Sequence, residues 1–174
     1  MSLLFSFIII IIILLFLRGA LSLAPWVPTR KEAIFRLGDL LDIKPGESFL
    51  ELGSGDGRVV SFLAKKNPES QFIGIEIVPY LYVVSLLRKY FGKQSNLEFK
   101  IGNAFKEDFG RYTHIFVFGL PESIRDTVLP KLEKEAKIGT KLYSYAFSFP
   151  KEYMHKVESF GTPNEQKIHI YTKK

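Results

Sequence analysis

The sequence contains no cysteine, and its three histidines (His114, His155 and His169) lie far apart. The absence of cysteine excludes a disulfide framework, thiolate zinc ligation and a cysteine nucleophile. No two histidines have the i, i+4 spacing that places a pair on one helix face, so no metal site is predicted. The net charge is only +6, and lysines alternate with glutamates over residues 131–137. Charge alone therefore does not indicate a nucleic-acid partner.

An apolar run occupies the N-terminus. Residues 3–17 read LLFSFIIIIIILLFL, and residues 19–24 continue the run after Arg18. A helix over residues 3–24 would be roughly 33 Å long, which is about the thickness of a bilayer core, and Pro25 would end it. A cleaved signal peptide is the alternative. It is disfavoured because no basic residue precedes the run and Pro25 follows the best small-residue pair. We expect residues 1–24 to be an uncleaved transmembrane anchor.

Basic residues lie only on the C-terminal side of this run, beginning with Arg18, Arg30 and Lys31. The positive-inside rule then predicts a single-pass membrane protein whose catalytic domain faces the cytoplasm.

Residues 25–174 are long enough for one independent domain. Helices are predicted over residues 30–42, 58–66, 79–91 and 122–137. Strands are predicted over residues 48–52, 71–77, 97–101, 113–119, 140–149, 156–160 and 167–172. Alternation of strands and helices indicates an α/β fold with a mostly parallel, Rossmann-like sheet, and the last two strands can pair as an antiparallel hairpin. We therefore expect seven strands ending in that hairpin.

A glycine-rich loop follows the first predicted strand, where the residues from Glu51 to Arg58 read ELGSGDGR. In an open α/β sheet, ligands bind at the carboxyl ends of the strands. The spacing is G-x-G-x-G, which fits neither the dinucleotide fingerprint nor a P-loop. A pyrophosphate ligand is therefore disfavoured, and a nicotinamide oxidoreductase is the least favoured function. Glu51 instead suits a ligand that carries an ammonium group.

Two further elements extend this site. Glu76 ends the second predicted strand, 19 residues beyond Gly57, where a carboxylate can accept hydrogen bonds from both ribose hydroxyls. Asn103 and Ala104 follow the third strand, where a side-chain amide can bind an adenine edge, although Asn103 can also be a simple turn residue. Adenosine with an amino-acid tail is S-adenosylmethionine. The predicted cofactor-binding residues are Glu51, Gly53, Ser54, Gly55, Asp56, Gly57, Glu76, Asn103 and Ala104, and Asp56 is also expected to cap the following helix.

The chain resembles the class I, seven-stranded S-adenosylmethionine-dependent methyltransferases in its ELGSGDGR, GIE (residues 74–76) and GNAF (residues 102–105) motifs. Residues 25–29 (PWVPT) resemble a P-Y-V-P-T segment of the archaeal and the membrane-anchored mitochondrial protein-lysine methyltransferases. Residues 116–121 (FVFGLP) and 147–150 (FSFP) are similar to segments of the mitochondrial group. Two positions depart from these patterns. Trp26 replaces a tyrosine, and Asn103 stands where many members of the superfamily carry aspartate.

The resemblance implies methyl transfer to a lysine nitrogen of a protein substrate, at a channel formed by Trp26, Thr29, Phe118 and Pro121. The acceptor must be neutral, because a protonated lysine has no lone pair, and an aromatic channel would lower its pKa by desolvation. No side chain is predicted to be an essential base. Trp26 is equally compatible with a membrane-interface anchor, Thr29 with a helix N-cap completed by Glu32, and Phe118 with the core.

Other functions remain open. A membrane enzyme acting on a lipid, quinone or other small molecule has the same cofactor motifs. RNA methylation is less favoured because FGLP stands where base-modifying enzymes carry an Asn/Asp-Pro-Pro-aromatic motif. A non-catalytic binding module that keeps the cofactor fold is disfavoured by the intact Glu51, glycine loop and Glu76.

Overall fold

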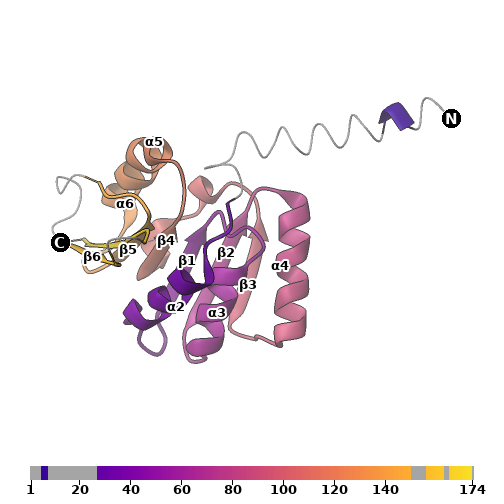
Figure 1. Ribbon diagram of the computed structural model, residues 1–174, viewed down its shortest axis with the longest axis horizontal. Helices are drawn as coiled ribbons and strands as arrows, with labels where there is room; N and C mark the ends of the chain where they lie inside the picture. The colour runs from indigo at the N-terminus through magenta and orange to yellow at the C-terminus, as the bar shows by residue number, and fades with distance from the viewer. Residues whose placement is uncertain (1–4, 8–26, 150–155, 163–164, 174) are drawn as a thin grey trace.

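The computed structural model describes residues 5–7, 27–149, 156–162 and 165–173. Seven strands form one sheet in the order β3-β2-β1-β4-β5-β7-β6 (Figure 1). They are β1 (Ser48–Leu52), β2 (Gln71–Glu76), β3 (Leu97–Ile101), β4 (His114–Val117), β5 (Lys141–Tyr145), β6 (Lys156–Phe160) and β7 (Ile168–Thr172). Strands β1 to β5 are parallel, whereas β7 is antiparallel to β5 and β6. The predicted mostly parallel sheet with a C-terminal antiparallel hairpin is confirmed.

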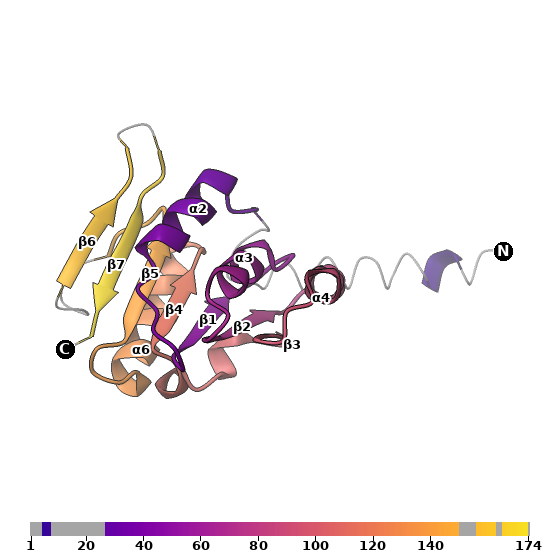
Figure 2. The ribbon, with the colours of Figure 1, turned by 90° about the horizontal axis from the view of Figure 1, so that it is seen from below.

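Helices cover both faces of the sheet (Figure 2). One face packs against α2 (Lys31–Leu40), α3 (Arg58–Lys66) and α4 (Pro79–Gly92), and its core is rich in phenylalanine. The other packs against α5 (Pro121–Ser123), η3 (Ile124–Val128) and α6 (Leu129–Glu135). Two short 3₁₀ turns, η1 (Ala104–Lys106) and η2 (Phe109–Arg111), join β3 to β4. Because both faces are covered, β1 and β4 lie in the buried centre of the sheet.

The order of the strands reverses at β1. From β1 the chain proceeds to β2 and β3 on one side, and it then returns to form β4 on the other side. Such a switch point opens a crevice at the carboxyl ends of the two central strands, which is where open α/β sheets bind ligands. Leu52 pairs with Val117, so the glycine loop after β1 and the segment beginning at Phe118 leave the sheet side by side.

Two predicted elements are shorter or less regular than expected. The helix predicted over 122–137 contains a π-helical turn, in which the N–H of Leu129 donates to the carbonyl of Ile124. Pro130 has no N–H to donate to Asp126, so the regular α-helical ladder cannot continue there. The fifth strand ends at Tyr145 instead of residue 149, because Ala146 adopts a left-handed φ of 76°.

The predicted membrane anchor lies almost entirely outside the described residues, which include only residues 5–7 of it. Within the part of the chain that the structure describes, no helix is both long and apolar enough to cross a membrane. The predicted N-cap of the first domain helix is wrong. Arg30 occupies that position without a side-chain capping hydrogen bond, and Thr29 is buried just before it.

Candidate functional site

The glycine loop forms a tight turn between β1 and α3. Gly53, Gly55 and Gly57 all have positive φ, at 72°, 55° and 75°. The N–H groups of Gly53 and Ser54 donate to the carbonyl of Ile75, at 3.0 and 2.9 Å, which fixes the start of the loop against β2. These left-handed conformations favour glycine over any residue with a side chain.

Gly57 and Gly74 also provide space for close packing beneath the loop. A Cβ atom on Gly57 would lie 2.4 Å from the Phe99 ring and 2.9 Å from Ser85. A Cβ on Gly74 would lie 2.9 Å from both Phe99 and Ser54. The glycines therefore allow the loop, β2 and β3 to approach one another. The buried hydroxyl of Ser54 has no hydrogen-bond partner among the described residues.

Glu76 joins the end of β2 to the glycine loop. Its Oε2 accepts from the N–H of Gly55 at 2.7 Å, and its Oε1 accepts from the N–H of Val78 at 2.8 Å. The side chain is buried. Each carboxylate oxygen has a second lone pair, so the group can still accept hydrogen bonds from a ligand.

Glu51 lies under the other side of the loop. Its Oε2 accepts from the N–H of Val60 in α3, at 3.0 Å. Burial raises the pKa of Glu51 well above its usual range; the Val60 hydrogen bond opposes this shift, and the nearby carboxylates of Asp56 and Glu76 add to it. No lysine or arginine of the described residues pairs with it. A buried acid beside two carboxylates is a site where a cationic ligand group would be strongly stabilised.

Asp56 is held away from this acid by two arginines. Its Oδ2 accepts from Arg58 at 2.8 Å and from Arg88 of α4 at 2.9 Å, and Arg88 also donates to its backbone carbonyl. Burial alone would raise the pKa of Asp56, but the guanidinium groups of Arg58 and Arg88 lower it below its usual range. Its Oδ1 accepts from the N–H of Arg58, the first residue of α3, as expected of a capping residue. Arg88 therefore ties α4 to the glycine loop.

Asn103 follows β3 and starts the η1 turn. Its Oδ1 accepts from the N–H of Phe105 at 2.9 Å, and its side chain is exposed. The N–H of Gly102 donates to the carbonyl of Glu76, so this turn lies directly beside the acid. The amide oxygen that was expected to face adenine thus serves the local turn, whereas Ala104 is buried next to it.

The predicted acceptor channel is only partly described. Trp26 lies outside the described residues. Phe118 is half-buried and makes an edge contact with Tyr145, with 4.8 Å between the ring centroids. Pro121 begins α5 just beyond it. The Phe118–Tyr145 pair lies at the ends of β4 and β5, beside the switch point, because Val117 pairs with Ser144.

Two residues of this region, Tyr145 and Arg88, were not singled out from the sequence. Tyr145 belongs to the predicted fifth strand, but nothing in the strand pattern indicated that its ring would meet Phe118. Arg88 lies on a helix whose apolar pattern hid its role, and it reaches a residue 32 positions earlier in the chain. No local spacing signal could have paired them.

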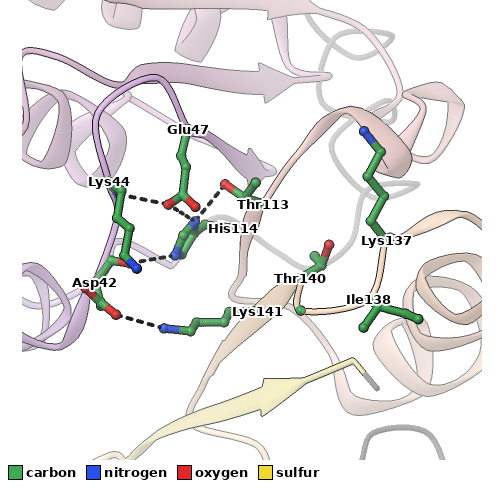
Figure 3. Close-up of a pocket in the computed structure, with 10 residues that line it drawn as sticks. Asp42, Lys44, Glu47, Thr113, His114, Lys137, Ile138, Thr140 and Lys141 are labelled. Atoms are coloured by element: carbon green, nitrogen blue, oxygen red, sulfur yellow. Dashed lines mark hydrogen bonds and ion pairs between the residues drawn. The ribbon is translucent and has the colours of Figure 1, made fainter.

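A separate cavity of about 290 Å³ lies at the opposite, amino-terminal edge of the sheet (Figure 3). His114 lies at its centre. One ring nitrogen is 2.9 Å from the Thr113 hydroxyl, and the other is 3.2 Å from the carbonyl of Asp42. Burial lowers the pKa of His114, despite the opposing charge of Glu47. This histidine is structural, in accordance with its expected role.

Comparison with known proteins identifies the class. An RNA methyltransferase from Salinibacter ruber, solved with S-adenosyl-L-homocysteine, matches with a TM-score of 0.73 and 27% identity over 84% of this chain and 93% of that one. The fold, the glycine loop and the Glu76 position are those of a class I S-adenosylmethionine-dependent methyltransferase. The model of the ANTKMT methyltransferase domain matches residues 51–156, and the chain belongs to this family. The predicted class and cofactor are confirmed.

Two curated relatives are lysine methyltransferases by name. A human lysine N-methyltransferase, named for an ATP synthase subunit, is 31% identical over 72% of this chain and 53% of its own length. A protein-lysine N-methyltransferase of Saccharolobus islandicus is 30% identical over 84% of this chain and 92% of its own length. The chain thus spans about half the length of the human relative and nearly all of the archaeal one.

Proposed function

We propose that this protein is a membrane-anchored S-adenosylmethionine-dependent methyltransferase that modifies a lysine side chain of a protein. The observation that carries the proposal is the coupling of the glycine loop to Glu76 at the switch point, next to the aromatic pair of Phe118 and Tyr145. The names of the human and archaeal relatives support lysine as the acceptor.

The residues at the switch point fit this cofactor. Glu51 is buried without a cationic partner among the described residues and suits the ammonium group of the methionine tail. Glu76 suits the ribose hydroxyls. The backbone of Gly53, Ser54, Gly55 and Gly57 allows close approach, and Asn103 and Ala104 would flank the adenine. Asp56 has a different part, because its arginine contacts hold the shape of the loop.

When bound, S-adenosylmethionine supplies an electrophilic methyl group on a sulfonium centre. The protein's own contribution is to position the acceptor and exclude water. Alignment of the two reactants supplies several kcal/mol of the barrier reduction, without a general base. The lysine nitrogen attacks with its lone pair, the carbon–sulfur bond breaks, and the product amine releases a proton to solvent.

The aromatic pair is the proposed acceptor wall. Phe118 and Tyr145, together with Thr29, Pro121 and Trp26, would desolvate the lysine and lower its pKa, so that the neutral amine is populated. Aromatic faces would also attract the cationic methylated product, by roughly 0.5–2 kcal/mol.

The apolar run of residues 3–24 supports a membrane tether. Its length and its flanking basic residues are the basis for placing the domain on the cytoplasmic side of a single-pass anchor. A tether restricts the enzyme to acceptors at or near the membrane.

RNA methylation is the second candidate. It is favoured by the Salinibacter RNA methyltransferase and by a probable ribosomal RNA small subunit methyltransferase A of Methanosarcina acetivorans, which is 33% identical over 62% of this chain. The FGLP segment after β4 disfavours it, because base-modifying enzymes carry a different motif there. A lipid or other small-molecule acceptor remains an outcome of the test below.

The test is transfer of tritiated methyl groups by the full-length chain in membranes that contain their native proteins, lipids and RNA. The extract is then separated into protein, lipid and RNA fractions. The proposal expects label in protein and none when S-adenosylhomocysteine is in excess. Label that enters only lipid or RNA would overturn the assignment of lysine. Cofactor binding without transfer to any fraction would indicate the non-catalytic binding module.

A further inference from the structure

Helix α4 exposes an apolar face that nothing in the described structure covers. Of its fourteen residues, only Leu81 and Ser85 are buried. Seven large apolar side chains are instead 38–76% exposed: Tyr80, Val83, Val84, Leu86, Leu87, Tyr90 and Phe91. A helix that is apolar on nearly all sides is normally covered by protein or by lipid. Exposed patches of this kind mark interaction sites.

The position of α4 leaves this face accessible. The helix packs beside β3, the edge strand, and it lies at the outer end of the α2-α3-α4 layer (Figure 1, Figure 2). Tyr80, Val83, Val84, Leu87 and Phe91 follow i, i+3, i+4 spacing, so they form one continuous stripe along the helix. The two exposed ends of the stripe are aromatic.

The charge around the face is exclusively basic. No acidic residue lies between Glu76 and Glu98, whereas Arg88, Lys89 and Lys93 lie on or next to α4. Anionic lipid headgroups attract such residues by about 1 kcal/mol for each one near the surface. An apolar stripe with aromatic ends and basic flanks is typical of a helix that lies in a membrane interface.

We propose that the α4 face rests on an anionic bilayer surface, with the helix axis along the membrane. The sequence supports lipid as the occupant, because a run of membrane-spanning length precedes the domain and would hold it at the bilayer. The inference rests on the proposed function for this tether. The helix begins at Pro79, three positions after Glu76, and Arg88 binds the glycine loop. The cofactor site would thus be held close to the membrane plane, within reach of lysines near the headgroups.

The absence of cysteine makes the test direct, because single-cysteine variants can be labelled at one position. A nitroxide is attached to the full-length chain at Val84→Cys or Leu87→Cys. The matched control is Ile138→Cys, which replaces another apolar side chain that is 82% exposed but lies away from α4. Collision rates with oxygen and with a water-soluble nickel chelate are measured on phosphatidylcholine vesicles with and without phosphatidylglycerol.

The expected result is a several-fold rise in the ratio of oxygen to nickel collisions at both α4 positions, larger with phosphatidylglycerol, and no rise at the control. The double substitution V83E/L87E should abolish that rise at Val84→Cys and leave S-adenosylmethionine binding unchanged. Ratios equal to the control would overturn the inference. Protection from both reagents on adding membrane protein alone, or dipolar broadening between chains, would overturn it in favour of a protein partner or a second copy. Cofactor binding is measured on the same samples, so loss of the proposed function is distinguished from loss of membrane contact.

Discussion

Glu76→Ala tests the role of the acid that joins β2 to the glycine loop. In the structure, its carboxylate accepts two buried backbone hydrogen bonds, at 2.7 and 2.8 Å. Hydrogen bonds to charged groups contribute about 1.5–3 kcal/mol each. Loss of one such bond from ribose would weaken S-adenosylmethionine binding roughly 10- to 150-fold. Leaving the N–H groups of Gly55 and Val78 unpaired would also lower the free energy of unfolding by about 1–3 kcal/mol.

Calorimetric titration with S-adenosylmethionine measures the first effect, and urea unfolding measures the second. Glu69→Ala is the control, because this exposed glutamate lies in the turn before β2, at the other end of that strand. Glu76→Gln keeps one oxygen for a backbone N–H but turns an amide donor toward the other, so its affinity should fall as well. A folded Glu76→Ala variant that binds the cofactor as tightly as the wild type would refute the assignment.

Three further predictions concern the same loop. Binding of a cationic cofactor beside Glu51, whose pKa is raised by burial, favours its carboxylate form. Binding should therefore release a proton, and affinity should rise with pH until the free acid has ionised. Calorimetry in buffers of different ionisation enthalpy measures this proton release, which Glu51→Gln should abolish; proton uptake would contradict it. Gly57→Ala should lower the free energy of unfolding by about 2–5 kcal/mol, because it combines a left-handed φ with a Cβ 2.4 Å from Phe99. An unchanged denaturation midpoint would contradict the packing described here. Arg88→Ala should weaken cofactor binding a few-fold and in a salt-dependent manner, since it removes an exposed partner of Asp56. Equal titrations of variant and wild type would show that this contact does not shape the loop.

The order of helices and strands could be predicted because each element carries its own periodicity. The glycine loop was recognisable for a related reason, since three left-handed positions within five residues require glycine at each. The position of Glu76 followed from the register of a parallel sheet, in which the ends of neighbouring strands meet. These features depend on short stretches of sequence.

The errors and omissions arise from contacts between distant residues. The fifth strand stops at Tyr145 because the following backbone turns to bond the carbonyl of Lys167. The salt bridge between Arg88 and Asp56 joins a helix to a loop, and neither residue signals the other. Asn103 was expected to face adenine, but its oxygen caps a 3₁₀ turn that the sequence pattern did not predict.

The most direct test of the lysine assignment is to identify the atom that receives the methyl group. The full-length chain is incubated with membrane proteins and S-adenosylmethionine that carries a deuterated methyl group, and peptides are examined by fragmentation mass spectrometry. The account predicts the deuterated methyl on the Nζ of lysine, and its loss with Glu76→Ala. Deuterated methyl groups found only on other side chains, or equal labelling by the Glu76→Ala variant, would contradict it.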